Sequence, residues 1–127
     1  MPYITLDLTP SITRYSAPET FLGKKIPRKS LTFSFGSLIY EVFSGQIPYS
    51  TLNDNQVSMA TTNGMSPGSV ANINSKLIKK LILNCWSEPN NRPSIVDISE
   101  ILEELLPSCK KLEFSLKFPL IFVFLNR

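Results

Sequence analysis

The sequence contains no histidine. This absence removes the commonest general base and metal ligand, and the usual partner of a nucleophilic serine. Only two cysteines are present, Cys85 and Cys109, and they have no C-x-x-C spacing. They therefore indicate neither a disulfide framework nor a zinc site. A reduced, cytoplasmic environment is the default expectation for such a chain.

Charge is also scarce. Charged residues make up 18% of the 127 positions and hydrophobic residues 43%, which indicates a packed chain of one domain and argues against general disorder. The net charge of +3 comes from dispersed lysines and arginines, with no dense basic run interleaved with aromatic residues. We interpret these charges as solvated faces and expect no nucleic-acid partner.

Long hydrophobic runs are missing as well. A membrane span needs roughly 20 apolar residues, and the strongest candidate, residues 114–125, is shorter and contains Lys117 and Pro119. Residues 1–10 do not have the pattern of a signal peptide. The tail 107–127 is interpreted as a divergent C-terminus, with membrane or partner contact through residues 114–125 as the alternative.

What the sequence does contain is a series of helical patterns. Eight of the thirteen residues from Leu31 to Phe43 are apolar or aromatic and do not form one stripe, which is typical of a helix buried on most sides. Asn53 is a plausible cap for a short helix that runs to Ala60. Residues 74–86 are amphipathic, and Ser94 with Asp97 forms a capping box that opens a last helix. Ile47–Tyr49 is expected to be extended, because the residue before a proline is pushed out of the helical region.

Five short motifs follow one another in this sequence: Arg14-Tyr15-Ser16-Ala17-Pro18-Glu19, Lys29-Ser30-Leu31-Thr32-Phe33-Ser34-Phe35-Gly36, Gly45-Gln46-Ile47-Pro48-Tyr49, Cys85-Trp86 and Asn91-Arg92-Pro93-Ser94. In order and spacing they resemble the second half of a protein kinase domain, from the A-P-E motif to the element before the last helix. The forms of the motifs are more similar to the tyrosine-kinase-like and tyrosine-kinase branches than to others. The resemblance covers about residues 3–106.

The resemblance implies an all-α fold, the C-terminal lobe (C-lobe) of a kinase, with about five helices around a buried central helix at residues 31–43. Residues 1–30 would be a remnant of the activation segment, residues 31–106 the helices of the lobe, and residues 107–127 a divergent tail. The parent enzyme would transfer the γ-phosphate of ATP to a Ser, Thr or Tyr hydroxyl of a protein.

The resemblance also implies roles for individual residues. Glu19 and Arg92 would form a buried ion pair that ties the activation segment to the loop before the last helix, and an arginine fork can bind a carboxylate through two nitrogens. Leu38 and Val42 would anchor the hydrophobic column of the lobe, and Trp86 would belong to the core.

The residues before Ala17 match the substrate side of a kinase. Arg14, Tyr15 and Ser16 match the loop that receives the substrate residue next to the phosphoacceptor. A further group matches the stretch in which such kinases carry activating phosphates, which act by pairing with arginine; its members are Thr5, Thr9, Ser11 and Thr13.

The sequence departs from the family where phosphoryl transfer takes place. It contains no G-x-G-x-x-G, no H-R-D and no D-F-G motif, and no strand lysine paired with a helix glutamate. Leu31 replaces an aspartate that hydrogen-bonds the catalytic loop, and Ile12 lies where a threonine is usual. No catalytic, cofactor-binding or metal-binding residue is therefore expected here, and ATP and magnesium would belong to the parent kinase.

The sequence thus predicts a kinase C-lobe fragment that is not catalytic alone. A pseudokinase-like module that binds a protein partner, or the missing kinase half, is the first alternative. A protein associated with a membrane through its tail is the second. Membrane association of a parent kinase of the receptor type also stays open.

Overall fold

The computed structural model describes residues 3–4, 13–23 and 26–105, and these residues fall into two compact units that divide between Arg92 and Pro93. The described residues are mainly helical, which confirms the predicted all-α class, with four α-helices where about five were expected. The helices are α2 (Lys29–Ser44), α3 (Asp54–Thr62), α4 (Lys76–Cys85) and α5 (Ile95–Leu105), with 3-10 helices η1 (Pro18–Leu22) and η2 (Pro89–Asn91). A minimal antiparallel ladder joins β1 (Tyr3–Ile4) to β2 (Ile26–Pro27).

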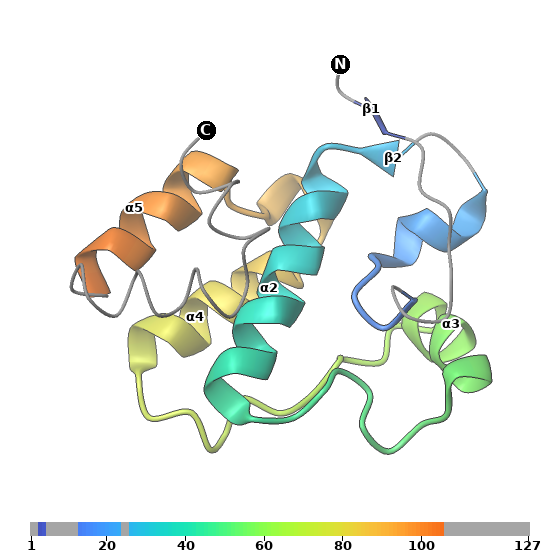
Figure 1. Ribbon diagram of the computed structural model, residues 1–127. Helices are drawn as coiled ribbons and strands as arrows, with labels where there is room; N and C mark the ends of the chain where they lie inside the picture. The colour runs from blue at the N-terminus through green and yellow to red at the C-terminus, as the bar shows by residue number, and fades with distance from the viewer. Residues whose placement is uncertain (1–2, 5–12, 24–25, 106–127) are drawn as a thin grey trace. The chain divides into compact units, whose positions relative to one another are not determined.

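Helix α2 is the longest element and runs through the first unit (Figure 1). It begins at Lys29, two residues before the predicted start, and Arg28 alone separates it from β2. Its end at Gly45 was predicted, and that glycine has the left-handed φ of 75° that favours glycine. The buried face of α2 combines large side chains with small polar ones: Phe33, Phe35, Ile39 and Tyr40, with Ser30, Thr32, Gly36 and Ser37.

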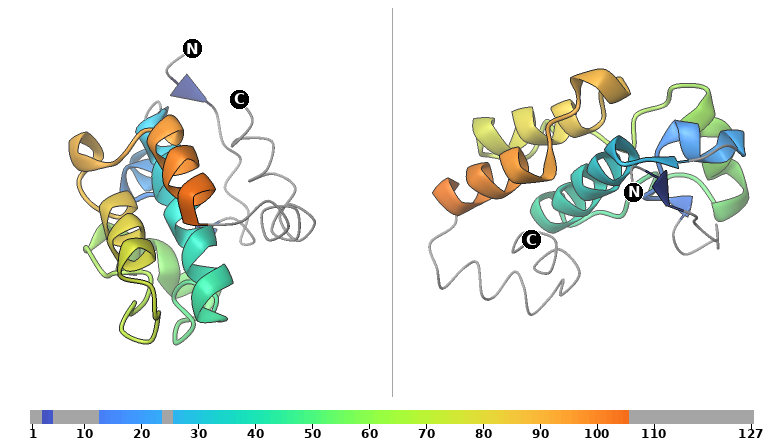
Figure 2. Two further views of the ribbon diagram at one scale, coloured as in Figure 1. Left: turned by 90° about the vertical axis from the view of Figure 1, so that its left-hand side faces the viewer. Right: turned by 90° about the horizontal axis from the view of Figure 1, so that it is seen from above.

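Helix α4 packs alongside α2, as Figures 1 and 2 show. The contact is close at Gly36, where an added Cβ would lie 2.4 Å from the Cβ of Cys85. Just beyond α4, the indole nitrogen of Trp86 donates a hydrogen bond of 3.0 Å to Ser37 Oγ, and its ring lies 5.3 Å from that of Tyr40. Because position 36 has no side chain, the backbone of α2 can lie directly against the Cys85 side chain of α4.

Helix α3 begins with the predicted Asn53 cap. The Asn53 side chain accepts a hydrogen bond from the backbone of Gln56, and the Gln56 side chain accepts one from the backbone of Asn53, which completes a capping box. The helix then continues two residues past its predicted end, to Thr62.

The turn before α3 departs from the predicted extended conformation. Tyr49 has a φ of 54°, a left-handed value that costs free energy for a residue other than glycine. Tertiary contacts hold it there: the side chain is buried, the backbone N–H donates to Pro67 O at 2.7 Å, and the hydroxyl donates to Met65 O. The proline rule applies to the residue before Pro48 and does not determine the residue after it.

In the second unit, α5 follows the predicted capping box. The Ser94 backbone donates to the Asp97 carboxylate at 3.2 Å, and the Asp97 backbone donates to Ser94 Oγ at 3.1 Å. Ile98 and Leu102, one turn apart, are buried. The tail 107–127, with the apolar stretch 114–125, lies outside the described residues. Within the part of the chain that is described, none of the helices has the length and apolar character needed to span a bilayer.

Candidate functional site

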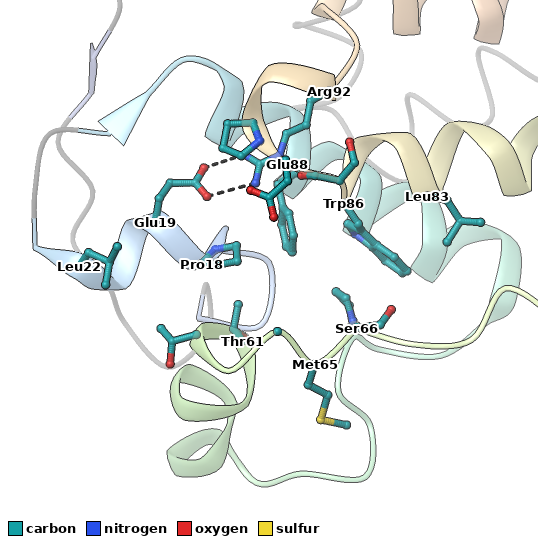
Figure 3. Close-up of a pocket in the computed structure, with 16 residues that line it drawn as sticks. Pro18, Glu19, Leu22, Thr61, Met65, Ser66, Leu83, Trp86, Glu88 and Arg92 are labelled. Atoms are coloured by element: carbon teal, nitrogen blue, oxygen red, sulfur yellow. Dashed lines mark hydrogen bonds and ion pairs between the residues drawn. The ribbon is translucent and has the colours of Figure 1, made fainter.

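The structure brings Glu19 and Arg92 together. Arg92 Nη1 lies 2.6 Å from Glu19 Oε2 and Nη2 lies 3.1 Å from Oε1, so that two parallel hydrogen bonds join the guanidinium to the carboxylate (Figure 3). The Arg92 side chain is 2% exposed and that of Glu19 is 21% exposed. The pair joins η1 to the loop that follows α4, and its geometry is the bidentate arrangement that gives an arginine pair both strength and direction.

Arg92 also contacts the start of α2. Its Nη1 donates to Lys29 O at 3.1 Å, its Nε donates to Ser87 O at 2.8 Å, and its guanidinium carbon lies 5.2 Å from the centre of the Phe33 ring. The Lys29 ammonium in turn donates to the Arg92 carbonyl. The buried charge is thus satisfied by a carboxylate, two carbonyls and an aromatic face, as a desolvated guanidinium requires.

The Glu19 carboxylate accepts a further hydrogen bond from Ser30 Oγ. Burial by itself raises the pKa of Glu19, but the hydrogen bonds from Arg92 and Ser30 outweigh burial and lower the pKa below its ordinary value. The carboxylate is therefore held in its charged form. We name the cluster of Glu19, Ser30, Phe33 and Arg92 the Glu19–Arg92 node.

Arg14 binds the turn before α3. Its Nη1 donates to Pro48 O at 3.0 Å and to Tyr49 O at 2.8 Å, its Nη2 donates to Leu52 O at 2.8 Å, and its Nε donates to Asp54 Oδ1 at 3.0 Å. All three guanidinium nitrogens are engaged within the molecule. In this structure Arg14 positions the turn that holds Tyr49 in its left-handed conformation.

The neighbours of Arg14 are also engaged. The Tyr15 hydroxyl donates to Glu41 Oε1 at 2.9 Å, and burial, with that carboxylate, raises the pKa of Tyr15 to about 12. The backbone of Ser16 donates to Thr13 O at 3.2 Å, and both residues are buried. The other predicted phosphorylation positions lie outside the described residues, as does Ile12; these are Thr5, Thr9 and Ser11.

The predicted hydrophobic anchors, Leu38, Val42 and Trp86, are all half-buried. Leu38 and Val42 are half-buried on α2, and so is Leu31, the residue that replaces the family's aspartate. Trp86 was predicted to belong to the core and is half-buried, in contact with both Ser37 and Tyr40 of α2. The assignment of Leu38 and Val42 to a hydrophobic column stays a prediction.

Several contacts of the site have no local sequence signal. Ser30 lies 11 positions from Glu19, and Asp54 lies 40 positions from Arg14. No periodicity or cap links such residues, and only the folded chain brings them together. Among the described residues, no group of three or more His, Cys, Asp or Glu side chains could hold a metal ion.

The comparisons with known proteins agree with the arrangement of these motifs. Residues 3–102 match the model of the family described as protein tyrosine and serine/threonine kinase. The serine/threonine-protein kinase VIK of Arabidopsis thaliana is 32% identical over 99 residues, which are 75% of this chain and 23% of that protein. Human mitogen-activated protein kinase kinase kinase 7 is 30% identical over 108 residues, 83% of this chain and 18% of that protein.

The chain therefore spans less than a quarter of the length of these relatives. The family match covers most of the chain and includes the segments that form the Glu19–Arg92 node. The chain belongs to the protein tyrosine and serine/threonine kinase family.

Proposed function

We propose that this chain is the C-lobe portion of a kinase domain, that it is not catalytic alone, and that its role is to bind a protein, either the missing half of a kinase domain or another partner. The parent activity is ATP-dependent phosphorylation of protein hydroxyl groups. The Arabidopsis thaliana relative is a serine/threonine-protein kinase by name, which favours Ser and Thr over Tyr as acceptors. The forms of Ser34-Phe35-Gly36 and Cys85-Trp86 favour the tyrosine-kinase-like branch.

The observation that carries this proposal is the Glu19–Arg92 node. It fixes the A-P-E segment against the loop after α4 through a desolvated ion pair, as a substrate-side scaffold requires. The groups that would cradle and transfer phosphate have no counterpart in the sequence, which lacks H-R-D, D-F-G and the Gly-rich loop. A scaffold without a phosphate cradle supports binding and does not support turnover.

Two finer proposals accompany the main one. Activating phosphates on Thr5, Thr9, Ser11 or Thr13 would act in a parent kinase by pairing with arginine. Tail-mediated membrane association through residues 114–125 is the weaker alternative, and a cytoplasmic location is proposed as the default. Liposome co-sedimentation with and without residues 108–127 separates the two locations.

Thermal unfolding of the full chain with and without millimolar Mg-ATP tests the proposal. A ligand that binds only the native state raises the melting temperature, and we expect no shift here. A shift that is abolished by a substitution in this chain would overturn the proposal. Co-expression with the upstream half of a kinase domain provides the positive measurement, since the proposal expects a complex that Arg92→Ala weakens.

A further inference from the structure

The first unit also contains a pocket beside the Glu19–Arg92 node, and the assignment to the kinase family does not depend on it. A pocket of about 530 Å³ opens between η1, the residues that follow α3 and the end of α4. Figure 3 shows Pro18, Met65 and Trp86 around one opening, with Leu22 and Leu83 at its margins. Three separate segments of the chain thus build its apolar wall.

The wall is unusually exposed for apolar side chains. Leu22 is 64% exposed, Leu83 is 51% exposed and Met65 is 45% exposed. These are three of the seven large hydrophobic side chains that are exposed in the described part of the chain. Single exposed apolar side chains are normal on a protein surface, but several around one pocket indicate a surface that another molecule covers.

The charge of the lining determines the kind of partner. Among the described residues, three charged side chains line the pocket, and two of them, Glu19 and Arg92, neutralise each other in the node. The third, Glu88, is exposed and makes no ion pair with any described residue. In the described part of the lining, the accessible charge is therefore one carboxylate at the edge of an apolar hollow. A complementary ligand carries an apolar group and an adjacent cation.

We propose that this pocket binds a peptide segment of a protein partner in which a large apolar side chain lies next to a lysine or arginine. The apolar side chain enters the hollow between Pro18 and Trp86, and the cation pairs with Glu88. Buried apolar anchors contribute most of the affinity of such contacts, and a rim charge contributes selectivity. This proposal names the surface for the binding role proposed above.

Fluorescence anisotropy of the full chain with a small peptide set tests this proposal. The probes are labelled decapeptides of Gly and Ser that carry one anchor (Leu, Phe or Trp) followed by two Lys, with partner peptides in which Ala replaces the anchor or Glu replaces each Lys. We expect the anchored Lys peptides to bind with a Kd below about 1 mM and the Glu peptides at least about fivefold more weakly at low salt.

Charge reversal gives the sharper measurement. Glu88→Lys is expected to reverse the preference, so that Glu peptides bind more tightly than Lys peptides. Glu100→Lys makes the same change of net charge at an exposed position of α5 and leaves the preference unchanged. Leu83→Ser weakens binding of the anchored peptides about tenfold. Met59→Ser removes a side chain that is 69% exposed on α3 and does not line the pocket, and it leaves binding unchanged.

The proposal is overturned if no anchored Lys peptide binds below about 1 mM, or if Glu88→Lys and Glu100→Lys alter the preference equally. All substituted residues are exposed, and circular dichroism melts verify that each variant is folded. The peptide experiment contains no nucleotide, so an absence of peptide binding would not change the Mg-ATP result. A thermal shift with Mg-ATP would overturn the non-catalytic role and would not change peptide binding.

Discussion

Arg92 Nη1 and Glu19 Oε2 lie 2.6 Å apart although 73 positions separate them in the sequence. The contact joins a 3-10 helix, the start of α2 and the loop after α4, because Arg92 also donates to Lys29 O and Ser87 O. One side chain therefore contacts three segments of the chain, and the hydrogen bonds from Ser30 to Glu19 and from Lys29 to the Arg92 carbonyl connect the same segments.

Replacement of Arg92 by alanine is the most direct test of that role. Arg92→Ala is expected to lower the free energy of unfolding by about 3–5 kcal/mol, because it leaves the Glu19 carboxylate without its partner in a desolvated site. Urea denaturation followed by circular dichroism measures the loss. Asp54→Asn is the control: it breaks the Arg14 pair, but the Asp54 side chain is 54% exposed, so that the expected loss is below about 1 kcal/mol. Similar losses in both variants would contradict the assignment.

The Glu19 pair also makes stability depend on pH. The pKa of Glu19 is lowered in the folded state from its ordinary value of 4.5, so the unfolded chain binds a proton first as the pH falls. The stabilisation is complete above 4.5 and is lost as the pH falls through the folded-state pKa. Denaturation midpoints between about pH 7 and pH 3 should therefore fall more steeply for the wild type than for Glu19→Gln. Parallel profiles would show that other carboxylates dominate.

Arg14 offers a test that separates charge from shape. Arg14→Lys keeps the positive charge but removes the fork, and one ammonium cannot reach the carbonyls of Pro48, Tyr49 and Leu52 together with Asp54. We expect a loss of about 1–3 kcal/mol from carbonyls left without a donor. Arg14→Lys and Arg14→Ala should cost nearly the same. Rescue by lysine would mean that charge alone matters at this position.

Gly36 is expected to resist even the smallest substitution. Gly36→Ala raises helix propensity, yet the new Cβ would lie 2.4 Å from Cys85 Cβ, so α2 and α4 must separate. Such overpacking costs about 1–3 kcal/mol. Thermal unfolding measures the effect, and Gly45→Ala is the control, because its Cβ meets no atom within 4 Å and its cost of about 1 kcal/mol comes from the positive φ. A Gly36→Ala protein as stable as the wild type would refute the close packing.

Helix positions were predictable where local chemistry decides them. Asn53 and Ser94 are caps whose partners lie three residues away, and Gly45 ends α2 by its own conformational freedom. The buried face of α2 was less predictable: Leu31 and Leu38 are half-buried whereas Ser30 and Ser37 are buried. Hydrophobicity alone cannot tell the buried serines from the half-buried leucines. The two serines are buried where their hydroxyls have hydrogen-bond partners: Ser37 accepts from Trp86, and Ser30 donates to Glu19.

The candidate site likewise contains features that the sequence predicted and features that it did not. Both members of the Glu19–Arg92 pair lie in recognisable motifs, and the resemblance to kinases suggested their pairing. Neither the engagement of Arg14 with Pro48, Tyr49 and Leu52 nor the left-handed Tyr49 had a sequence signal. These features depend on backbone carbonyls, which carry no residue identity, and on a turn whose conformation is imposed by distant contacts.

Helix α3 has few buried side chains, and this affects where the first unit unfolds locally. Of its nine residues, Val57 and Thr61 are the buried ones, and its first turn depends on the capping box at Asn53. A helix this short is marginal without tertiary support, so its amide protons should exchange with solvent well before those of α2. Thr61 and Thr62, at the end of α3, line the pocket beside Trp86. A peptide that binds in the pocket would therefore cover the end of α3, and slower amide exchange in α3 would report its binding.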